Sequence, residues 1–377
     1  MKIDDKTSHN SPSLRFPEFT GEWKEERLSE IADIYKGAGI SKDQLSDNGE
    51  PCILYGELYT KYKTETITEV ISRTDIDNTK LVRSKANDVI IPCSGETAED
   101  IATARCVIKD GILLGGDLNI IRLHNYDGSF VSYQLNGKRK YDIAKVAQGV
   151  SVVHLYGEHL KGVKTVNPCL AEQKKISRFL SLLDERIAVQ NRLIDRLQSL
   201  MIGIAQKIAH SNKPNVRISD CLECSSSALQ ESEVNKTGKY PVYGANGIVG
   251  YIDKYHTQNE AIYIIKDGSG VGGVSYVTGK CSSTGTLNIL QARNGHSLKY
   301  LYYLLKVFNF EPYKTGMAIP HIYFKDYGKA KIFCPAYPEQ LEYAKLLSSI
   351  DGNLRIALDS LKNFNLQKQY LLRHMLI

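Results

Sequence analysis

The sequence predicts a mixed α/β (α+β) protein in which two similar globular domains are joined by two long antiparallel helices. The first observation is an internal repeat, because residues 149–208 align with residues 316–375 at a constant offset of 167 positions without a gap. The second is a pair of sustained heptad patterns, one near the middle of the chain and one at its end. A repeat of this length indicates two copies of one supersecondary unit, and antiparallel pairing of their helices would relate the copies by a pseudo-twofold axis.

Short motifs recur at this offset and identify the repeat. His154-Leu155-Tyr156 recurs as His321-Ile322-Tyr323, and Glu172-Gln173 recurs as Glu339-Gln340. The second copy begins again near residues 216–220, which resemble residues 26–30. Between these anchors the sequences of the two halves diverge. The repeat therefore predicts that the two helices are similar and that the globular parts differ in sequence.

Five segments follow from these patterns. The globular parts contain strand-like apolar runs, such as residues 88–91 and 118–121, separated by glycine-rich turns. The first residues are polar and lack periodicity. The predicted order is a flexible tail over residues 1–13, a globular domain over 14–168, a central long helix over 169–212, a second globular domain over 213–335 and a C-terminal long helix over 336–377.

Both helices carry an apolar seam with alternating spacings of three and four residues, which is typical of a coiled coil. Gln190 interrupts the first seam and Lys368 the second. The principal seam positions are Ile176, Leu180, Leu183, Ile187, Ile194 and Leu197 in the first helix, and Leu347, Ile350, Leu354, Leu361 and Phe364 in the second.

The order of the segments predicts how the helices pair. The first helix leads from the first globular domain to the second, and the second helix starts from that second domain. If the two seams pair, the helices therefore run antiparallel. A helix of about 39 residues is about 58 Å long, whereas one turn of DNA is about 34–36 Å. The two domains could thus contact separate stretches of one duplex.

Composition narrows the class of protein. Of the 377 residues, 42% are hydrophobic and 24% charged, which is typical of soluble proteins. No apolar run approaches the length of a membrane span and no signal-like leader opens the chain, so we expect no membrane partner and a cytoplasmic location. The net charge of +6 permits a polyanionic partner without requiring one.

The eight cysteines are unequally spaced and are expected to be reduced. Cys221 and Cys224 form one CxxC, but further ligands could only come from the distant Cys281 and Cys334. We therefore expect buried structural thiols and no metal site.

Motifs for enzymatic chemistry are weak. Residues 268–273 match GxGxxG, but the β-branched and aromatic residues 274–277 follow where a dinucleotide site needs a helix, so a glycine-rich hairpin is favoured. The chain has no GxxxxGK[ST], HExxH or GxSxG motif. His154 and His321 occupy equivalent repeat positions and are interpreted as structural hydrogen-bonding groups or phosphate neighbours rather than catalytic residues.

Basic and aromatic residues interleave in the second half of each globular domain, at residues 138–145 and 299–314. Such stretches suit phosphate contact and base stacking. A solvated helix face also explains these stretches. For the stretches considered by themselves, that is the better interpretation.

In combination these features resemble the specificity subunit of type I restriction–modification systems. The opening residues 14–19 with Trp23, the two Pro-x-x-x-Glu-Gln helix starts at Pro168 and Pro335, and the duplicated domain–helix arrangement carry the resemblance. It covers almost the whole chain. Each motif is weak by itself, but their duplication in phase is specific.

The resemblance implies a non-enzymatic subunit that recognises double-stranded DNA. Each globular domain would be a target-recognition domain for half of a bipartite site, and the helices would set the spacer and dock two methyltransferase subunits. No cofactor is expected on this chain. S-adenosylmethionine would bind the methyltransferase subunits, and ATP with Mg²⁺ the restriction/translocase subunits.

Polar residues on predicted turns are the candidates for DNA contact, because they can hydrogen-bond base edges or phosphates. The candidates are Tyr55, Glu57, Ser94, Glu96, Gln148 and Ser151 in the first domain, and Tyr243, Asn246, Lys266, Ser269, Lys314 and His321 in the second.

Two alternatives from other classes remain open. One is a coiled-coil scaffold whose globular domains bind proteins and never DNA. The other is a nucleotide-dependent enzyme that uses the glycine-rich loop around Gly270.

Overall fold

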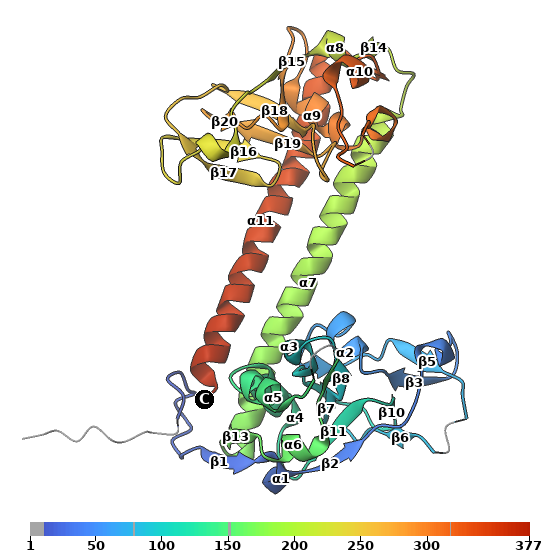
Figure 1. The fold of residues 1–377 in the computed structure, drawn as a ribbon, viewed down its shortest axis with the longest axis vertical. Helices are drawn as coiled ribbons and strands as arrows, with labels where there is room; N and C mark the ends of the chain where they lie inside the picture. Colours follow the sequence, from blue (N-terminus) through green and yellow to red (C-terminus); the bar gives the residue numbers. More distant parts are fainter. Residues whose placement is uncertain (1–10, 78–79, 150–151, 317) are drawn as a thin grey trace, which may run out of the picture. The chain divides into compact units, whose positions relative to one another are not determined.

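The chain folds into two compact units that share two long helices. The computed structural model describes residues 11–77, 80–149, 152–316 and 318–377. Unit 1 contains residues up to 190 and from 360 to 377, and unit 2 contains residues 191–359. Helix α7 (Leu170–Ala209) and helix α11 (Tyr337–Met375) each contribute a segment to both units (Figure 1). The helices thus begin and end within three residues of the segments expected from the heptads.

The globule of unit 1 is built on a five-stranded sheet in the order β2-β11-β7-β9-β4. All neighbours are antiparallel except β9 and β4. The strands are β2 (Ala32–Lys36), β11 (Leu118–Leu123), β7 (Asp88–Pro92), β9 (Arg105–Val107) and β4 (Thr66–Ile67). Both strands expected from the apolar runs, β7 and β11, are confirmed and lie side by side at the centre.

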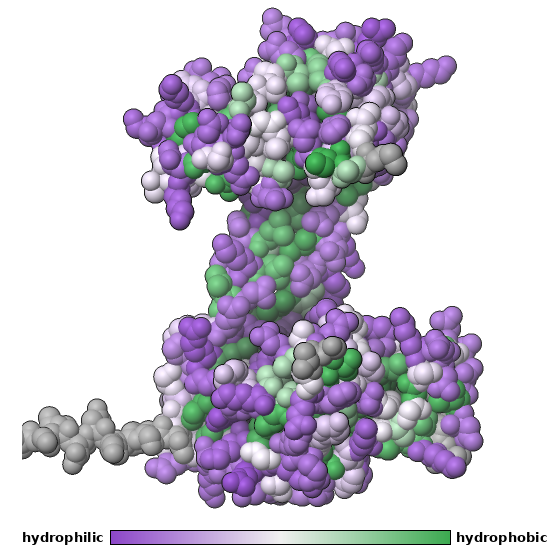
Figure 2. Space-filling view, in the orientation of Figure 1, coloured by the Kyte–Doolittle hydropathy of each residue, from purple (hydrophilic) through white to green (hydrophobic). Residues whose placement is uncertain are grey.

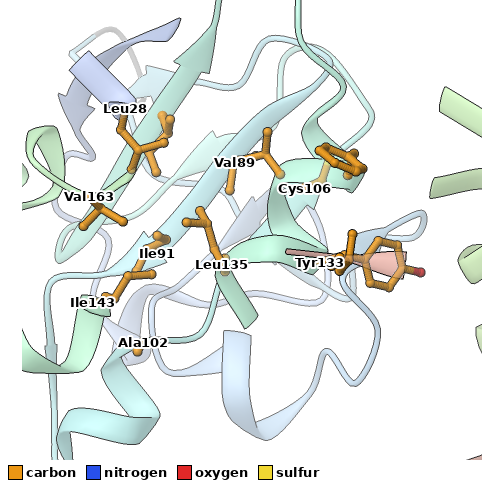
Figure 3. Close-up of a cluster of buried hydrophobic side chains, with 14 of the residues drawn as sticks. Leu28, Val89, Ile91, Ala102, Cys106, Tyr133, Leu135, Ile143 and Val163 are labelled. Atoms are coloured by element: carbon orange, nitrogen blue, oxygen red, sulfur yellow. The ribbon is translucent and has the colours of Figure 1, made fainter. Parts of the chain in front are cut away.

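Period-two alternation on β7 separates two apolar cores. Val89 and Ile91 point into one core with Leu135 and Ile143 (Figure 3), whereas Ile90 belongs to the other. Because both faces of the sheet are covered, its central strands read as continuous apolar runs. Helices of the first core are α1 (Leu28–Ile31), α3 (Ala98–Ile101), α4 (Gly128–Asn136), α5 (Lys140–Val146) and α6 (Gly157–Lys161).

Smaller sheets complete unit 1. A four-stranded sheet has the order β5-β3-β10-β6, and β1-β13 and β8-β12 form two separate two-stranded sheets. Helix α2 (Glu57–Thr60) follows β3. The strands are β5 (Ser72–Thr74), β3 (Glu50–Ile53), β10 (Leu113–Leu114), β6 (Val82–Arg83), β1 (Lys24–Arg27), β13 (Lys164–Asn167), β8 (Ser94–Gly95) and β12 (Val153–His154).

Unit 2 repeats this plan with fewer strands. A four-stranded sheet has the order β15-β21-β18-β19, a three-stranded sheet the order β17-β16-β20, and β14 pairs with β22. The strands are β14 (Val216–Arg217), β15 (Leu222–Ser226), β16 (Tyr240–Gly244), β17 (Gly247–Ile252), β18 (Glu260–Ile265), β19 (Val274–Thr278), β20 (Ser282–Ser283), β21 (Leu287–Ala292) and β22 (Lys331–Ile332). The helices are α8 (Ile218–Cys221), α9 (Leu298–Lys306) and α10 (Phe324–Tyr327).

A buried glutamine explains why Gln recurs at both helix starts. Gln173 Oε1 accepts a hydrogen bond from Asp127 N at 2.9 Å, and its Nε2 donates to Pro168 O at 2.8 Å. Gln340 makes the same two bonds, with Ser297 N and Pro335 O, both at 2.8 Å. Each glutamine therefore ties the start of the long helix to the N-terminus of a helix in its globule.

The predicted apolar seams pack the helices in both units. Ile176, Leu180 and Leu183 of α7 share the unit 1 core with Leu371 and Met375 of α11. The two helix segments run in opposite directions within each unit, as expected (Figure 1). Of the predicted seam residues, those that are buried are Ile176, Leu180, Leu183, Ile194, Leu347, Ile350 and Leu354, and those that are half-buried are Ile187, Leu197, Leu361 and Phe364.

Lys368, the polar residue within the apolar seam of α11, pairs with two carboxylates. Its Nζ lies 2.7 Å from Asp184 of α7 and 2.8 Å from Glu65 of the globule, and Tyr133 Oη donates to Asp184 at 2.6 Å. Burial raises the pKa of the Asp184 carboxyl above its ordinary value, although Lys368 opposes this. Burial favours a neutral Lys368, but Glu65 and Asp184 outweigh it and raise its pKa.

Within the described residues, no helix has the length and apolar character needed to traverse a bilayer.

Candidate nucleic-acid interface

The repeated His-x-Tyr motif forms one loop in each unit, which we call the histidine loops: residues 148–156 in unit 1 and 315–323 in unit 2, excluding 150, 151 and 317, which lie outside the described residues. Gln148 and His154 exchange two backbone hydrogen bonds of 2.9 and 2.7 Å. Thr315 and His321 exchange two of 2.9 and 2.8 Å. The same closed turn is therefore built twice.

A glycine is required at the same place in both loops. Gly149 has φ +126°, and a Cβ there would lie 2.1 Å from the carbonyl oxygen of Val152. Gly316 has φ +89°, and a Cβ would lie 2.3 Å from that of Ile319. Residues with a side chain rarely adopt positive φ and none tolerates such contacts, so these glycines define the turn.

Each loop is anchored to the end of a central strand. In unit 1, Leu155 N donates to Cys93 O at 2.7 Å, and Cys93 N donates to Asp117 O at 2.6 Å. In unit 2, Ile322 N donates to Lys266 O at 2.9 Å, and Lys266 N donates to Thr286 O at 3.0 Å. The histidine loops thus lie where β7 and β18 end, held by backbone bonds that do not depend on side-chain identity.

The side chains that the loops expose are suited to contact with a ligand. Val152 and Tyr156 are exposed in unit 1, and Ile319 and Tyr323 occupy the same positions in unit 2. The rings of His154 and Tyr156 stack with centroids 6.2 Å apart, and those of His321 and Tyr323 lie 5.9 Å apart. Exposed aromatic, imidazole and aliphatic groups can contact bases and phosphates.

Three of the residues predicted for DNA contact in unit 1 lie around this loop. Ser94 is half-buried and pairs with His154 across β8 and β12, while Glu96 and Gln148 are exposed. Ser151 lies outside the described residues. Ser94, Glu96 and Gln148 therefore stay candidates for contact.

Tyr55 and Glu57, the other two candidates of unit 1, lie between β3 and α2. Tyr55 is half-buried and packs against the second core. Glu57 is buried, and its carboxylate accepts from Leu54 N at 3.0 Å, from Lys61 Nζ at 2.6 Å and from the Ser72 hydroxyl. These bonds give Glu57 a structural role at the start of α2 and leave it poorly placed for a base edge.

The six candidates of unit 2 fall into two groups. Tyr243 is half-buried against Tyr263 near the end of β16, and Asn246 is exposed on the two-residue turn between β16 and β17. The remaining four lie on the histidine loop, the β18–β19 hairpin or beside them: Lys266, Ser269, Lys314 and His321.

Hydrogen bonds connect the two groups of candidate residues. Tyr243 O accepts from Thr284 N at 2.9 Å, and the hydroxyls of Thr284 and Thr286 lie 2.8 Å apart. Thr286 O in turn accepts from Lys266 N. A path of hydrogen bonds through the buried Thr284 therefore links the β16 hairpin to the histidine loop of unit 2.

The charges differ between the two loops. In unit 2, His321 Nδ1 lies 3.7 Å from Asp267, Lys314 pairs with Glu311 at 2.6 Å, and Lys325 lies over the Tyr323 ring at 5.2 Å. The unit 1 loop borders a cavity of about 290 Å³, which Lys36, Asp117 and Asn119 also line.

The repeated His-x-Tyr signal could have identified Tyr156 and Tyr323 from sequence, because both residues are aromatic at equivalent positions.

Two further sequence features, the glycine-rich run and the basic stretches with aromatic residues, take the following forms in the structure. The glycine-rich residues 268–273 connect the antiparallel strands β18 and β19, so the hairpin interpretation is confirmed. The tyrosines of α9 are not available for stacking, because Tyr300, Tyr302 and Tyr303 are buried. By contrast, Tyr141 on α5 is 67% exposed, with Lys145 Nζ 4.3 Å from its ring centroid.

The chain matches a known family over most of its length. The family model described as "Type I restriction modification DNA specificity domain" matches residues 20–199 and again residues 211–363. Among curated relatives, the EcoprrI specificity subunit of Escherichia coli is 25% identical over 30% of this chain and 28% of its own length. The MjaVIII specificity subunit of Methanocaldococcus jannaschii is 24% identical over 52% of this chain and 43% of its own.

The matched stretches therefore span less than half of these curated relatives, whereas a solved structure matches over its whole length. The S subunit of a type I restriction–modification system from M. genitalium aligns with a TM-score of 0.72 at 18% identity, covering 97% of this chain and 99% of that one. This similarity shows the shared fold, and the duplicated architecture expected from the sequence is confirmed. With the family model matching both halves, the chain belongs to the type I restriction–modification DNA specificity family.

Proposed function

We propose that this chain is the non-catalytic specificity subunit of a type I restriction–modification complex and reads a bipartite DNA target with one recognition domain in each unit. The observation that carries the proposal is the pair of histidine loops, which present the same exposed positions on the same strand-end anchor in both units. Two like surfaces on one chain suit two half-sites on one duplex.

The proposal assigns the first half-site to the globule of residues 14–168 and the second to that of residues 213–335. Direct contacts would come from Ser94, Glu96 and Gln148 in unit 1, and from Lys266, Ser269, Lys314 and His321 with Asn246 in unit 2. Tyr156 and Tyr323 join them as exposed aromatic residues at equivalent positions.

We assign the spacing between the half-sites to α7 and α11. These helices contain 40 and 39 residues, and at 1.5 Å per residue each is about 60 Å long. Helices of this length fix distance better than a flexible linker because their backbone hydrogen bonds are internal.

The same helices are proposed to dock two methyltransferase subunits. Several apolar side chains on them are exposed: Phe179, Leu182, Val189, Leu366 and Tyr370 in unit 1, and Leu193, Leu200, Ile202, Ile356 and Leu358 in unit 2. Figure 2 shows apolar surface along the long helices. In unit 1 some of these side chains line a cavity of about 650 Å³. Contiguous exposed apolar surface typically marks a protein interface. S-adenosylmethionine, ATP and Mg²⁺ are assigned to methyltransferase and restriction/translocase partners.

The docking assignment is tested by co-purification with the methyltransferase subunits. Leu182→Glu places a charge in the proposed interface and is expected to abolish co-purification, whereas Lys109→Glu, on an exposed part of the unit 1 globule, leaves it intact. Co-purification of the Leu182 variant at the wild-type level would contradict the assignment.

DNA recognition is tested by the salt dependence of binding in the assembled complex. A DNA reader with several phosphate contacts is expected to lose affinity steeply between about 50 and 200 mM salt. A protein scaffold that never meets DNA would show no binding with partners present. Mapping methylated adenines in cells that express the complex is expected to reveal one bipartite motif.

The spacing assignment is tested by lengthening both helices. Insertion of one heptad after Gln190 in α7 and one after Asp359 in α11 adds about 10 Å, which is about 3 base pairs of DNA at 3.4 Å each. The methylated motif is expected to keep both half-sites and gain that many spacer positions. An unchanged spacer would exclude the helices as the determinant of spacing.

A further inference from the structure

Three soft metal-ligand groups meet in unit 2. Cys221 ends α8, Cys334 lies two positions after the end of β22, and His296 lies in the turn before α9. Their two sulfur atoms and a ring nitrogen all lie within 4.8 Å of one another. This is the only such group of His, Cys, Asp or Glu within residues 11–77, 80–149, 152–316 and 318–377. We propose that Cys221, His296 and Cys334 bind one Zn²⁺ ion, with water as the fourth ligand.

An orphaned polar atom gives independent support. Nδ1 of His296 is buried and has no hydrogen-bond partner among the described residues. A buried nitrogen of this kind normally has a partner, because leaving it unpaired is unfavourable. A metal ion bound at Nδ1 would satisfy it and would replace the contact that the Cys221 and Cys334 thiols make with each other.

The donor set selects the metal. Two thiolates and one imidazole are soft ligands, which favour Zn²⁺ and disfavour the hard, oxygen-preferring Mg²⁺ and Ca²⁺. Both cysteines are buried and reduced. On binding, each thiol would release its proton to solvent and the imidazole would bind in its neutral form.

The ligands are held in place by their backbones. Cys221 O accepts from Arg293 N at 2.9 Å. Asn215 brackets Cys334 with two bonds of 2.8 Å, from its Nδ2 to Cys334 O and from Cys334 N to its Oδ1. His296 N donates to Arg293 O at 3.2 Å. In metal sites, hydrogen bonds to the ligating residues orient them for the ion in this way.

The first copy of the repeat shows what this place in the fold requires. Tyr126 and Asn167, which stand where His296 and Cys334 stand in unit 2, both donate hydrogen bonds to Glu26, at 2.8 and 3.0 Å. Glu26 corresponds to Val216, which cannot bridge the two groups. Unit 1 therefore joins these segments through a carboxylate, and unit 2 lacks that carboxylate and carries metal ligands instead.

The function that we assign to the ion is structural. Cys334 precedes Pro335, where the chain turns into α11, and the ion would tie this entry to α8 and to the turn before α9. The site would then contribute to the stability of unit 2, because an ion that binds only the folded state stabilises it.

The experiment measures metal on the purified full-length chain under reducing conditions. Zinc content by mass spectrometry is expected to be one ion per chain, and replacement by Co²⁺ is expected to give thiolate-to-metal absorption and tetrahedral visible bands. His296→Gln, which changes a half-buried side chain, is expected to weaken Zn²⁺ binding by more than the roughly 10–100-fold that loss of an outer contact causes.

The cysteines supply matched variants. Cys334→Ser is expected to abolish the cobalt spectrum, whereas Cys224→Ser, in the same CxxC as Cys221, is expected to leave it unchanged. A chelator is expected to lower the melting temperature of the wild type and not that of His296→Gln. Absence of bound zinc, zinc retained by Cys334→Ser, loss of zinc in Cys224→Ser, or a Cys221–Cys334 disulfide under reducing conditions would each overturn the proposal.

Discussion

In unit 1, Lys368 of α11 bridges Asp184 of α7 and Glu65 of the globule, whereas the corresponding helix position in unit 2 is Met201, which is buried. Tyr133 donates to Asp184 in unit 1, but the corresponding Tyr303 donates to Ser348 at 3.3 Å. The two units thus attach the same helices to similar globules by an ionic network in one case and by mainly apolar packing in the other.

Both copies of the repeat retain the contacts that involve backbone groups. The glutamines at the helix starts and the glycines of the histidine loops make backbone-directed contacts, and both copies retain them. Side-chain clusters are free to differ because several chemistries can fill one space. Among the described residues of unit 2 no ion pair is buried, so the shared fold does not depend on one.

The largest expected effect comes from making unit 1 resemble unit 2 at a single position. Lys368→Met removes the cation that directly contacts the buried Asp184 and Glu65 carboxylates, and is expected to reduce the free energy of unfolding by about 3–5 kcal/mol. Lys362→Met, at an exposed position of the same helix, is the matched control. Denaturant unfolding measures both variants. A decrease of less than about 1 kcal/mol in the free energy of unfolding of Lys368→Met would show that the ionic network does not stabilise unit 1.

The next effect concerns the two glutamates of the Glu-Gln motif. Glu172 is buried and pairs with Arg15 at 2.7 Å, whereas Glu339 is exposed and accepts from Tyr343 at 2.8 Å. Arg15→Ala is expected to destabilise unit 1 by about 2–3 kcal/mol because a buried carboxylate loses its partner. Glu339→Gln is expected to change stability by less than about 0.5 kcal/mol. Equal losses in chemical unfolding would contradict the difference between the copies.

The glycines of the histidine loops should respond alike in both units. Gly149→Ala and Gly316→Ala are expected to strain their loops by about 1–2 kcal/mol, enough to weaken binding of the complex to DNA by about tenfold. Gly352→Ala, where a Cβ meets no atom within 4 Å, is the control. Competition binding with each half-site altered in turn shows which unit is affected, and normal affinity of both loop variants would exclude the loops from DNA contact.

The smallest effect is a dependence of stability on pH. Because the folded protein raises the pKa of Lys368 above 10.5, the stabilisation is fully present below about pH 10.5 and is lost as pH rises through the folded value. The stability difference between wild type and Lys368→Met is therefore expected to narrow above that pH. Melting temperatures of both proteins between pH 9.5 and 11.5 test the sign, and a widening difference would contradict it.

The sequence predicted the helices more completely than the candidate site. The seams from Ile176 and Leu347 onwards were visible because a heptad repeats locally, and the offset of His154 and His321 located the histidine loops. Glu57 was chosen as a polar turn residue, but its bonds to Lys61 and Ser72 depend on segments up to 15 positions away. No local pattern reports such contacts.

The duplication, the two long helices and their opposed directions follow from the sequence alone, because periodicity and connectivity are properties of chain order. Which polar groups meet follows from folding. Lys368 and Glu65 are separated by 303 positions, yet they lie 2.8 Å apart. The meeting of Cys221, His296 and Cys334 was likewise decided by folding, since the geometry that joins distant side chains arises only when the strands and helices pack.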